Sequence, residues 1–274
     1  MLTGKMLMDD VHAYKPAAGE MAFWWIGQMG FFVKLGNATL LIDPFLSPGP
    51  GRTVPPLVAP EDLAGVDYIF GTHDHSDHID HRSFPGMAAG CDAKFIVPEM
   101  FVKALAEEFN LPQSRFIGMD EGKVFVDEQK GLTIKAIASA HEFLDADPVT
   151  GLHPALGYII EADGERIYHA GDSCKYDGME GKLKQMGPFD VMYLPINGRD
   201  GKRYKMNCIG NMNFAEAVDL AGVVAPRLAV PGHYEMFAMN SENPMLFTDY
   251  MEAKYPLQEF WVGGHGVKVV VAAK

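Results

Sequence analysis

The stretch 72–78, Thr-His-Asp-His-Ser-Asp-His, constrains this chain more than any other. It places three histidines and two aspartates directly after the short apolar run 68–70, which is typical of a buried strand. A tight loop at a strand end can direct alternate side chains to one point, and imidazole and carboxylate are ligands that zinc, manganese and iron accept. The alternative is a solvated loop rich in histidine and aspartate. The density of the cluster favours a metal-binding loop.

Length and composition limit what surrounds this loop. The chain has 274 residues, 48% of them hydrophobic, and no stretch resembles a linker, so we expect a single domain over residues 1–274. Its net charge of -13 disfavours a nucleic-acid partner. Residues 1–20 lack the apolar run of a signal peptide or membrane span. Three widely spaced cysteines fit a reducing compartment, so we expect a cytoplasmic protein with no membrane partner.

Apolar runs separated by turn residues predict alternating strands and helices. Gly36-Asn37 and Asp163-Gly164 are typical of hairpin turns, and Asn213 with Glu216 is typical of a helix start. Strands are expected at 21–25, 31–35, 39–42, 68–70, 94–97, 123–126, 132–138, 157–161, 165–169, 190–195, 227–230, 259–262 and 267–271, and helices at 84–89, 101–109, 179–186, 214–221 and 244–254. This order predicts an α/β protein in which two β-sheets pack face to face with helices outside.

Residues 44–60 contain six prolines and two glycines without a regular apolar period, which predicts a long surface loop. Such a loop beside a site is a candidate lid, and its Arg52 is a candidate contact for an anionic substrate. An ordered connection with a solvated arginine is the alternative.

Other expected strands also end in residues of the ligand type. His141, Asp172 and His233 each follow one, which raises the total to five imidazoles and two carboxylates. One tetrahedral ion needs fewer, whereas two ions roughly 3.5–4 Å apart with a bridging carboxylate use them all. Asp43 also closes a strand, where it either caps the turn or hydrogen-bonds a ligand histidine from behind.

The His-x-His-x-Asp-His loop, the later His141, Gly171-Asp172 and Pro231-Gly232-His233 together resemble the metallo-β-lactamase superfamily over about residues 21–271. Within it, segments 23–27, 72–80, 168–173 and 212–233 are similar to the L-ascorbate-6-phosphate lactonase-like metal-dependent hydrolases. The chain departs from those lactonases in a shorter N-terminal part, in Cys174, and in Tyr234, where they have a histidine.

The resemblance implies a four-layer αββα sandwich and two divalent ions, manganese or zinc, with iron as a further option. It assigns His73, His75 and His141 to one ion, Asp77, His78 and His233 to the other, and Asp172 as the bridge. A metal-bound hydroxide would then attack a carbonyl or phosphoryl centre, while Asp77 orients it and carries its proton. The resemblance also implies a possible homo-oligomer.

Lesser candidates surround this set. Arg199, Lys202 and Arg203 belong to the densest basic patch of an acidic chain, and they are either a handle for an anionic substrate or a solvated loop. Cys174 either approaches the metals as a thiolate or packs as a small apolar residue. His153, His169 and His265 are expected to be structural.

Three functions follow. The first is hydrolysis of a small anionic carbonyl ester such as a phosphorylated sugar lactone, with L-ascorbate 6-phosphate as the example. The second is a nuclease-like or phospholipid-type phosphodiesterase, which the acidic charge and the lack of a basic amphipathic helix disfavour. The third is a non-catalytic metal-binding protein, which the complete ligand set disfavours.

Overall fold

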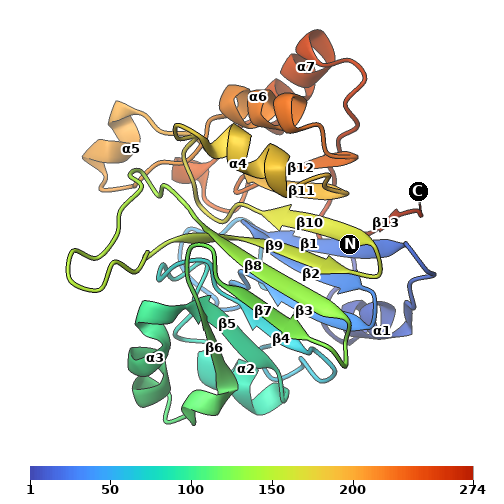
Figure 1. Cartoon of the computed structure of the whole chain (residues 1–274), viewed down its shortest axis with the longest axis vertical. Helices are drawn as coiled ribbons and strands as arrows, with labels where there is room; N and C mark the ends of the chain where they lie inside the picture. Colours follow the sequence, from blue (N-terminus) through green and yellow to red (C-terminus); the bar gives the residue numbers. More distant parts are fainter. Residues whose placement is uncertain (274) are drawn as a thin grey trace.

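Strand β1 (Met21–Gly27) shows how the first sheet is packed on both sides. Phe23 and Trp25 belong to a core shared with the second sheet. Trp24 and Ile26 belong to a core shared with the helices that cover the outer face of the first sheet. Successive side chains of a strand point to opposite faces, so an all-apolar strand is stable only when both faces are covered. The computed structural model, which describes residues 1–273, has such a cover over both sheets (Figure 1).

The first sheet has seven strands in the order β13-β1-β2-β3-β4-β5-β6, and the second has six in the order β12-β11-β10-β9-β8-β7. The remaining strands of the first sheet are β2 (Gly30–Leu35), β3 (Ala38–Ile42), β4 (Tyr68–Phe70), β5 (Lys94–Pro98), β6 (Phe116–Met119) and β13 (Lys268–Val271). Those of the second are β7 (Val124–Asp127), β8 (Leu132–Ala138), β9 (Leu156–Ala162), β10 (Glu165–His169), β11 (Val191–Pro195) and β12 (Leu228–Gly232).

Helices form the two outer layers. Those against the first sheet are α1 (Gly4–Ala13), α2 (Phe84–Gly90) and α3 (Val102–Glu108), and those against the second are α4 (Met179–Met186), α6 (Phe214–Val224) and α7 (Pro244–Lys254). The helix α5 (Gly201–Lys205) and the 3-10 turns Glu99–Phe101, Gln113–Arg115 and Ala238–Asn240 complete the elements. The predicted four-layer αββα sandwich is therefore confirmed, and Figure 1 shows the layers in cross-section.

Two local predictions were wrong, and two elements were not predicted. The stretch 259–262 is not a strand, because only Phe260 bridges to Ala229 before Gly263 and Gly264 lead the chain away. Strand β6 was not predicted, since it is short and contains a glycine. The segment containing α5 was expected to be a loop, but the side chain of Asp200 caps a short helix there by accepting from two backbone N–H groups.

Helix α1 was also not predicted, because charged residues separate the few apolar residues of its narrow buried stripe. Leu7, Met8 and Val11 are buried on the face toward the first sheet, while Met6 on the opposite side is 63% exposed. Within residues 1–273, no helix combines the length and apolar character needed to cross a bilayer.

The α1 stripe predicts a large stability difference between neighbouring residues. Leu7→Ala should lower the free energy of unfolding by about 2–4 kcal/mol, because it leaves a cavity in a packed layer. Met6→Ala on the exposed side is the matched control and should change it by less than about 0.5 kcal/mol. Urea denaturation measures both, and equal effects would mean that α1 does not pack on the sheet.

Candidate metal centre

The predicted ligands converge because parallel strands end at the same edge. Strands β3 to β6 run parallel in the first sheet, and β10 to β12 run parallel in the second. The loop after β4 carries residues 73–78, and the loops after β8, β10 and β12 carry His141, Asp172 and His233. Carboxyl ends of parallel strands form a common crevice, so segments far apart in the chain meet there.

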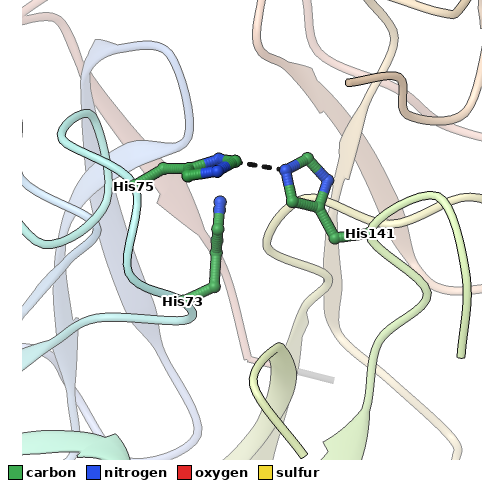
Figure 2. A group of neighbouring side chains, drawn as sticks. All are labelled: His73, His75 and His141. Carbon is green, nitrogen blue, oxygen red and sulfur yellow. Dashed lines mark hydrogen bonds between the residues drawn. The ribbon is translucent and has the colours of Figure 1, made fainter. Parts of the chain in front are cut away.

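Three histidines form the first group. One ring nitrogen from each of His73, His75 and His141 lies within 4.8 Å of the others. Nδ1 of His75 is 3.0 Å from Nε2 of His141. Figure 2 shows the three rings turned toward one point, two from the loop after β4 and one from the loop after β8. The arrangement brings together the set that the sequence assigned to one ion.

The second group joins Asp77 and His78 to His233, again with ligand atoms within 4.8 Å of one another. Oδ2 of Asp77 is 3.8 Å from Nε2 of His78 and 3.5 Å from Nε2 of His233. These residues match the predicted second set.

Asp172 lies beside both groups. Its Oδ1 is 3.3 Å from Nε2 of His78, and its Oδ2 is 3.2 Å from Nε2 of His233. Ligand atoms of His73, His78 and Asp172 also lie within 4.8 Å of one another. Asp172 thus contacts two residues of the second group and lies near His73 of the first, which is a suitable place for a bridge, although that role stays a prediction.

Nε2 of His73 is buried at the centre and has no hydrogen-bond partner within the described part of the chain. Nε2 of His78 and Oδ1 of Asp172 are also buried there and, although 3.3 Å apart, form no well-aligned hydrogen bond. A buried polar atom without a partner costs about 1–3 kcal/mol. Since imidazole nitrogen and carboxylate oxygen both bind divalent ions, the residues fit a metal.

The carboxylates at the centre favour a positive charge beside them. Burial alone would lower the pKa of His78 and of His233, but nearby carboxylates, Asp172 foremost, raise both, to about 9 for His233. Burial would raise the pKa of Asp77 and of Asp172, but the imidazoles of His78 and His233 hold both below their usual range. In contrast, burial lowers the pKa of His141 to about 4, so this imidazole is neutral and ready to bind a metal.

Asp43 supports the centre from behind. Its Oδ2 is 2.7 Å from Nδ1 of His78, and its two oxygens accept from the backbone N–H and the hydroxyl of Thr72, each at 2.8 Å. Of the two roles left open by the sequence, contact with a ligand histidine is therefore observed. This contact directs Nε2 of His78 toward the other ligands.

Two residues near the ligands were missed. Gln28 is buried after β1, and its Nε2 donates to Oδ2 of Asp77 at 2.8 Å. Asn211 is also buried, and its Oδ1 is 3.2 Å from Nδ1 of His141. Gln28 follows a strand, as Asp43 does, so its position was a usable signal. Nothing in the sequence around Asn211 indicates the contact.

The backbone at the centre is unusual. Gln28, Asp43 and His233 have φ values of 51°, 43° and 58°, in a region that residues other than glycine rarely adopt. Gly171, with φ of 59°, approaches Thr72 so closely that a Cβ there would lie 2.7 Å from its side chain. Such positions cluster where a packed structure imposes a functional geometry.

A cavity of about 230 Å³ opens onto the ligands. Besides five of the seven ligand residues, its lining consists of Asn207, Cys208, Ile209 and Asn240. Cys174 is absent from this lining and is buried, and its Sγ donates to the carbonyl of Gly210. Of the two readings of Cys174, packing as a small residue agrees with this position, and burial raises its thiol pKa.

The predicted substrate contacts lie near this cavity but outside its lining. Arg199 binds both carboxylate oxygens of Glu216, at 2.6 and 2.7 Å. Arg203 pairs with Asp200 and donates to the carbonyl of Ser241. Lys202 is exposed on α5. Two of the three cations are thus engaged by carboxylates of the chain itself.

The other candidates have structural contacts. Arg52 donates to the carbonyls of Phe45, Ser47 and Val54, so it holds the proline-rich loop together. His153 contacts Asp120, His169 contacts the carbonyl of Met29, and His265 stacks on Trp25.

Removing Asp172 tests the shared role of this carboxylate. Asp172→Ala should lose most bound metal, because both ligand groups lose a contact, and elemental analysis of the purified protein measures this. Asp74→Ala is the matched control, since Asp74 is in the same site but faces outward to His81. Wild-type metal content in Asp172→Ala would contradict the bridge.

A second substitution tests the support behind His78. Asp43→Asn keeps the shape but weakens the acceptor for Nδ1 of His78, so metal affinity should fall roughly 10–100-fold. Competition with a chromogenic chelator measures the affinity, and circular dichroism checks the fold. A folded variant with unchanged affinity would show that Asp43 only caps the turn.

Residues 38–234 match the family model of the β-lactamase superfamily domain. A UPF0173 metal-dependent hydrolase of Pyrococcus abyssi is 32% identical over 223 residues, which cover 81% of this chain and 88% of that protein. Among solved structures, Igni18, a metallo hydrolase from Ignicoccus hospitalis, has a TM-score of 0.71 at 23% identity and covers 93% of this chain and 100% of that one. An isothiocyanate hydrolase from Delia radicum gut bacteria has a TM-score of 0.68 at 17% identity, covering 92% and 100%.

The two structures show the shared fold, while the sequence match and the family model show the relationship. The chain therefore belongs to the metallo-β-lactamase superfamily, in the family of the UPF0173 metal-dependent hydrolases.

Proposed function

We propose that this protein hydrolyses a small carbonyl ester, with a lactone as the first candidate, at a centre that holds two divalent ions. The observation that carries this proposal is the group of buried ligand atoms without hydrogen-bond partners, such as Nε2 of His73 and of His78, beside an open cavity. The open cavity beside the ligands also argues against a non-catalytic metal-binding role, because such a role does not require a cavity next to the ions.

We divide the ligands between two ions as the family resemblance implies. His73, His75 and His141 would hold one ion, and Asp77, His78 and His233 the other, with Asp172 between them. Nitrogen and oxygen donors suit manganese or zinc, and iron is a further option. Bound ions would supply a water of lowered pKa and would polarise the carbonyl group.

Asp77 is the proposed proton carrier. It lines the cavity, and the donation from Gln28 to its Oδ2 holds the carboxylate in one orientation. A carboxylate fixed in this way can accept a proton from the attacking water and deliver it to the leaving oxygen.

The size of the cavity supports a small substrate. A volume of about 230 Å³ is below the usual range for drug-sized ligands, so a ring such as a lactone fits better than a polymer. A phosphodiester is the second candidate, since the same ligand sets could act on phosphorus. The fold cannot choose between these electrophiles, because one fold supports many reactions.

An anionic group on the substrate would meet the basic segment that includes Arg199, Lys202 and Arg203. Lys202 is the most accessible of these candidates, given the carboxylate partners of the two arginines. The three free cysteines, Cys91, Cys174 and Cys208, support a cytoplasmic setting.

The proposal is tested by hydrolysis assays on manganese- and zinc-reconstituted protein of confirmed metal content. L-Ascorbate 6-phosphate and γ-butyrolactone represent lactones, bis(p-nitrophenyl) phosphate represents phosphodiesters, and Asp172→Ala serves as the control. We expect kcat/KM above ~10⁴ M⁻¹s⁻¹ for at least one lactone, within the ordinary range of enzymes.

If only the phosphodiester is hydrolysed, the electrophile is phosphorus and the protein is a phosphodiesterase, which would overturn the carbonyl-ester assignment. No turnover of any substrate, with the metals bound, would overturn both assignments.

A further inference from the structure

Exposed apolar side chains occur in three segments that contain, or follow closely on, residues lining the metal cavity. Sixteen large hydrophobic side chains are exposed among residues 1–273. Six of them lie in the short segments 143–144, 204–209 and 239–240: Phe143, Leu144, Tyr204, Met206, Ile209 and Met239. We call these six residues the apolar rim. Single exposed apolar residues are common, but a group of them in one place indicates a binding surface.

Contacts within the chain connect these segments to the site. Ile209 lines the cavity, and Phe143 forms a β-bridge with the ligand His141. Burial and the nearby carboxylate of Glu142 raise the pKa of Tyr204, which places the segment after β8 close to the segment of α5. In Figure 1 the loop after β8 and helix α5 project from the same side of the molecule.

Met239 is included in the rim because the next residue, Asn240, lines the cavity. Oδ1 of Asn240 accepts a hydrogen bond from Asn197 at 2.9 Å. Asn197 in turn accepts from Asn211 at 3.1 Å, and Asn211 contacts the ligand His141. A chain of three amides, of which Asn197 and Asn211 are buried, thus ties this part of the rim to the metal centre.

Of the cations near the rim, Lys202 is exposed but the two arginines are already engaged by other groups of the chain. Arg199 is held by Glu216, and Arg203 by Asp200 and the carbonyl of Ser241. Phe143, by comparison, is 64% exposed, and Met206 is 50% exposed. Water at such apolar surfaces is released when an apolar group covers them.

We propose that the apolar rim binds an alkyl or aryl group of the ester substrate while its carbonyl reaches the metal ligands. This inference rests on the proposed hydrolysis and specifies the substrate class. The occupant is a substrate group rather than a protein, because the rim continues directly into the small cavity through Ile209.

The test compares γ-nonanolactone with γ-butyrolactone on metal-reconstituted protein. The longer lactone adds a five-carbon chain, and its kcat/KM should be at least about tenfold higher. Phe143→Ser and Ile209→Ser should each reduce this ratio toward one. Leu257→Ser is the matched control, since Leu257 is 97% exposed and lines a different depression, and it should leave the ratio unchanged.

Calorimetric binding of nonanoate and acetate provides a readout that needs no turnover. Nonanoate should bind more tightly than acetate, and Ile209→Ser should remove the difference. Turnover of both lactones at equal kcat/KM would overturn the rim inference while the proposed function stands.

If neither lactone is hydrolysed, the proposed function fails, and the binding measurement decides the rim: tighter binding of nonanoate supports it, and equal affinities overturn it. Sedimentation identifies the other occupant. A dimer that Phe143→Ser dissociates without changing the lactone ratio would make the rim an interface between two copies of this chain and would overturn the proposal.

Discussion

Two buried carboxylates, Asp43 and Asp172, set the conditions for the rest of this structure. Isolating such charges from water costs several kcal/mol each unless they are paired. Asp43 is paired with Thr72 and His78, and Asp172 lies against His78 and His233. His78 is therefore held between two carboxylates from different sheets. The strained backbone at Gln28, Asp43 and His233 follows from the need to bring these groups together.

Strands and loops have different roles in this fold, and this difference explains how the geometry of the ligands is maintained. The strands supply apolar side chains to both faces of each sheet, so they are rigid and contribute little chemistry. The loops at their carboxyl ends supply the ligands. Gly171 lets the loop after β10 contact Thr72 in the loop after β4, which closes the space between the two sheets. The packing of the sheets thus determines the distances between ligands.

The sequence predicted the strand ends well because buried strands have strong apolar runs and the ligands are dense. It could not choose between the two roles of Asp43, because that choice depends on which histidine the fold brings near. Asn211 was missed because a single amide has no distinctive pattern, and Gln28 was missed although its position after a strand was a usable signal. The carboxylate partners of Arg199 and Arg203 were not predicted either. Glu216 is distant in the chain from Arg199, and the pairing of Arg203 with the nearby Asp200 depends on the local turn.

The origin of the ligands in both sheets has a mechanical consequence. Residues 73–78 follow a strand of the first sheet, whereas His141, Asp172 and His233 follow strands of the second. An ion held by both sets acts as a cross-link between sheets in a chain whose three cysteines are all free. A disulfide restricts the unfolded chain by closing a loop, whereas such an ion would stabilise the chain by binding its folded state. The gain would follow the concentration of free metal, at about 2.7 kcal/mol for a hundredfold excess over Kd. The stability of the metal-loaded fold would therefore depend on the free metal in its surroundings.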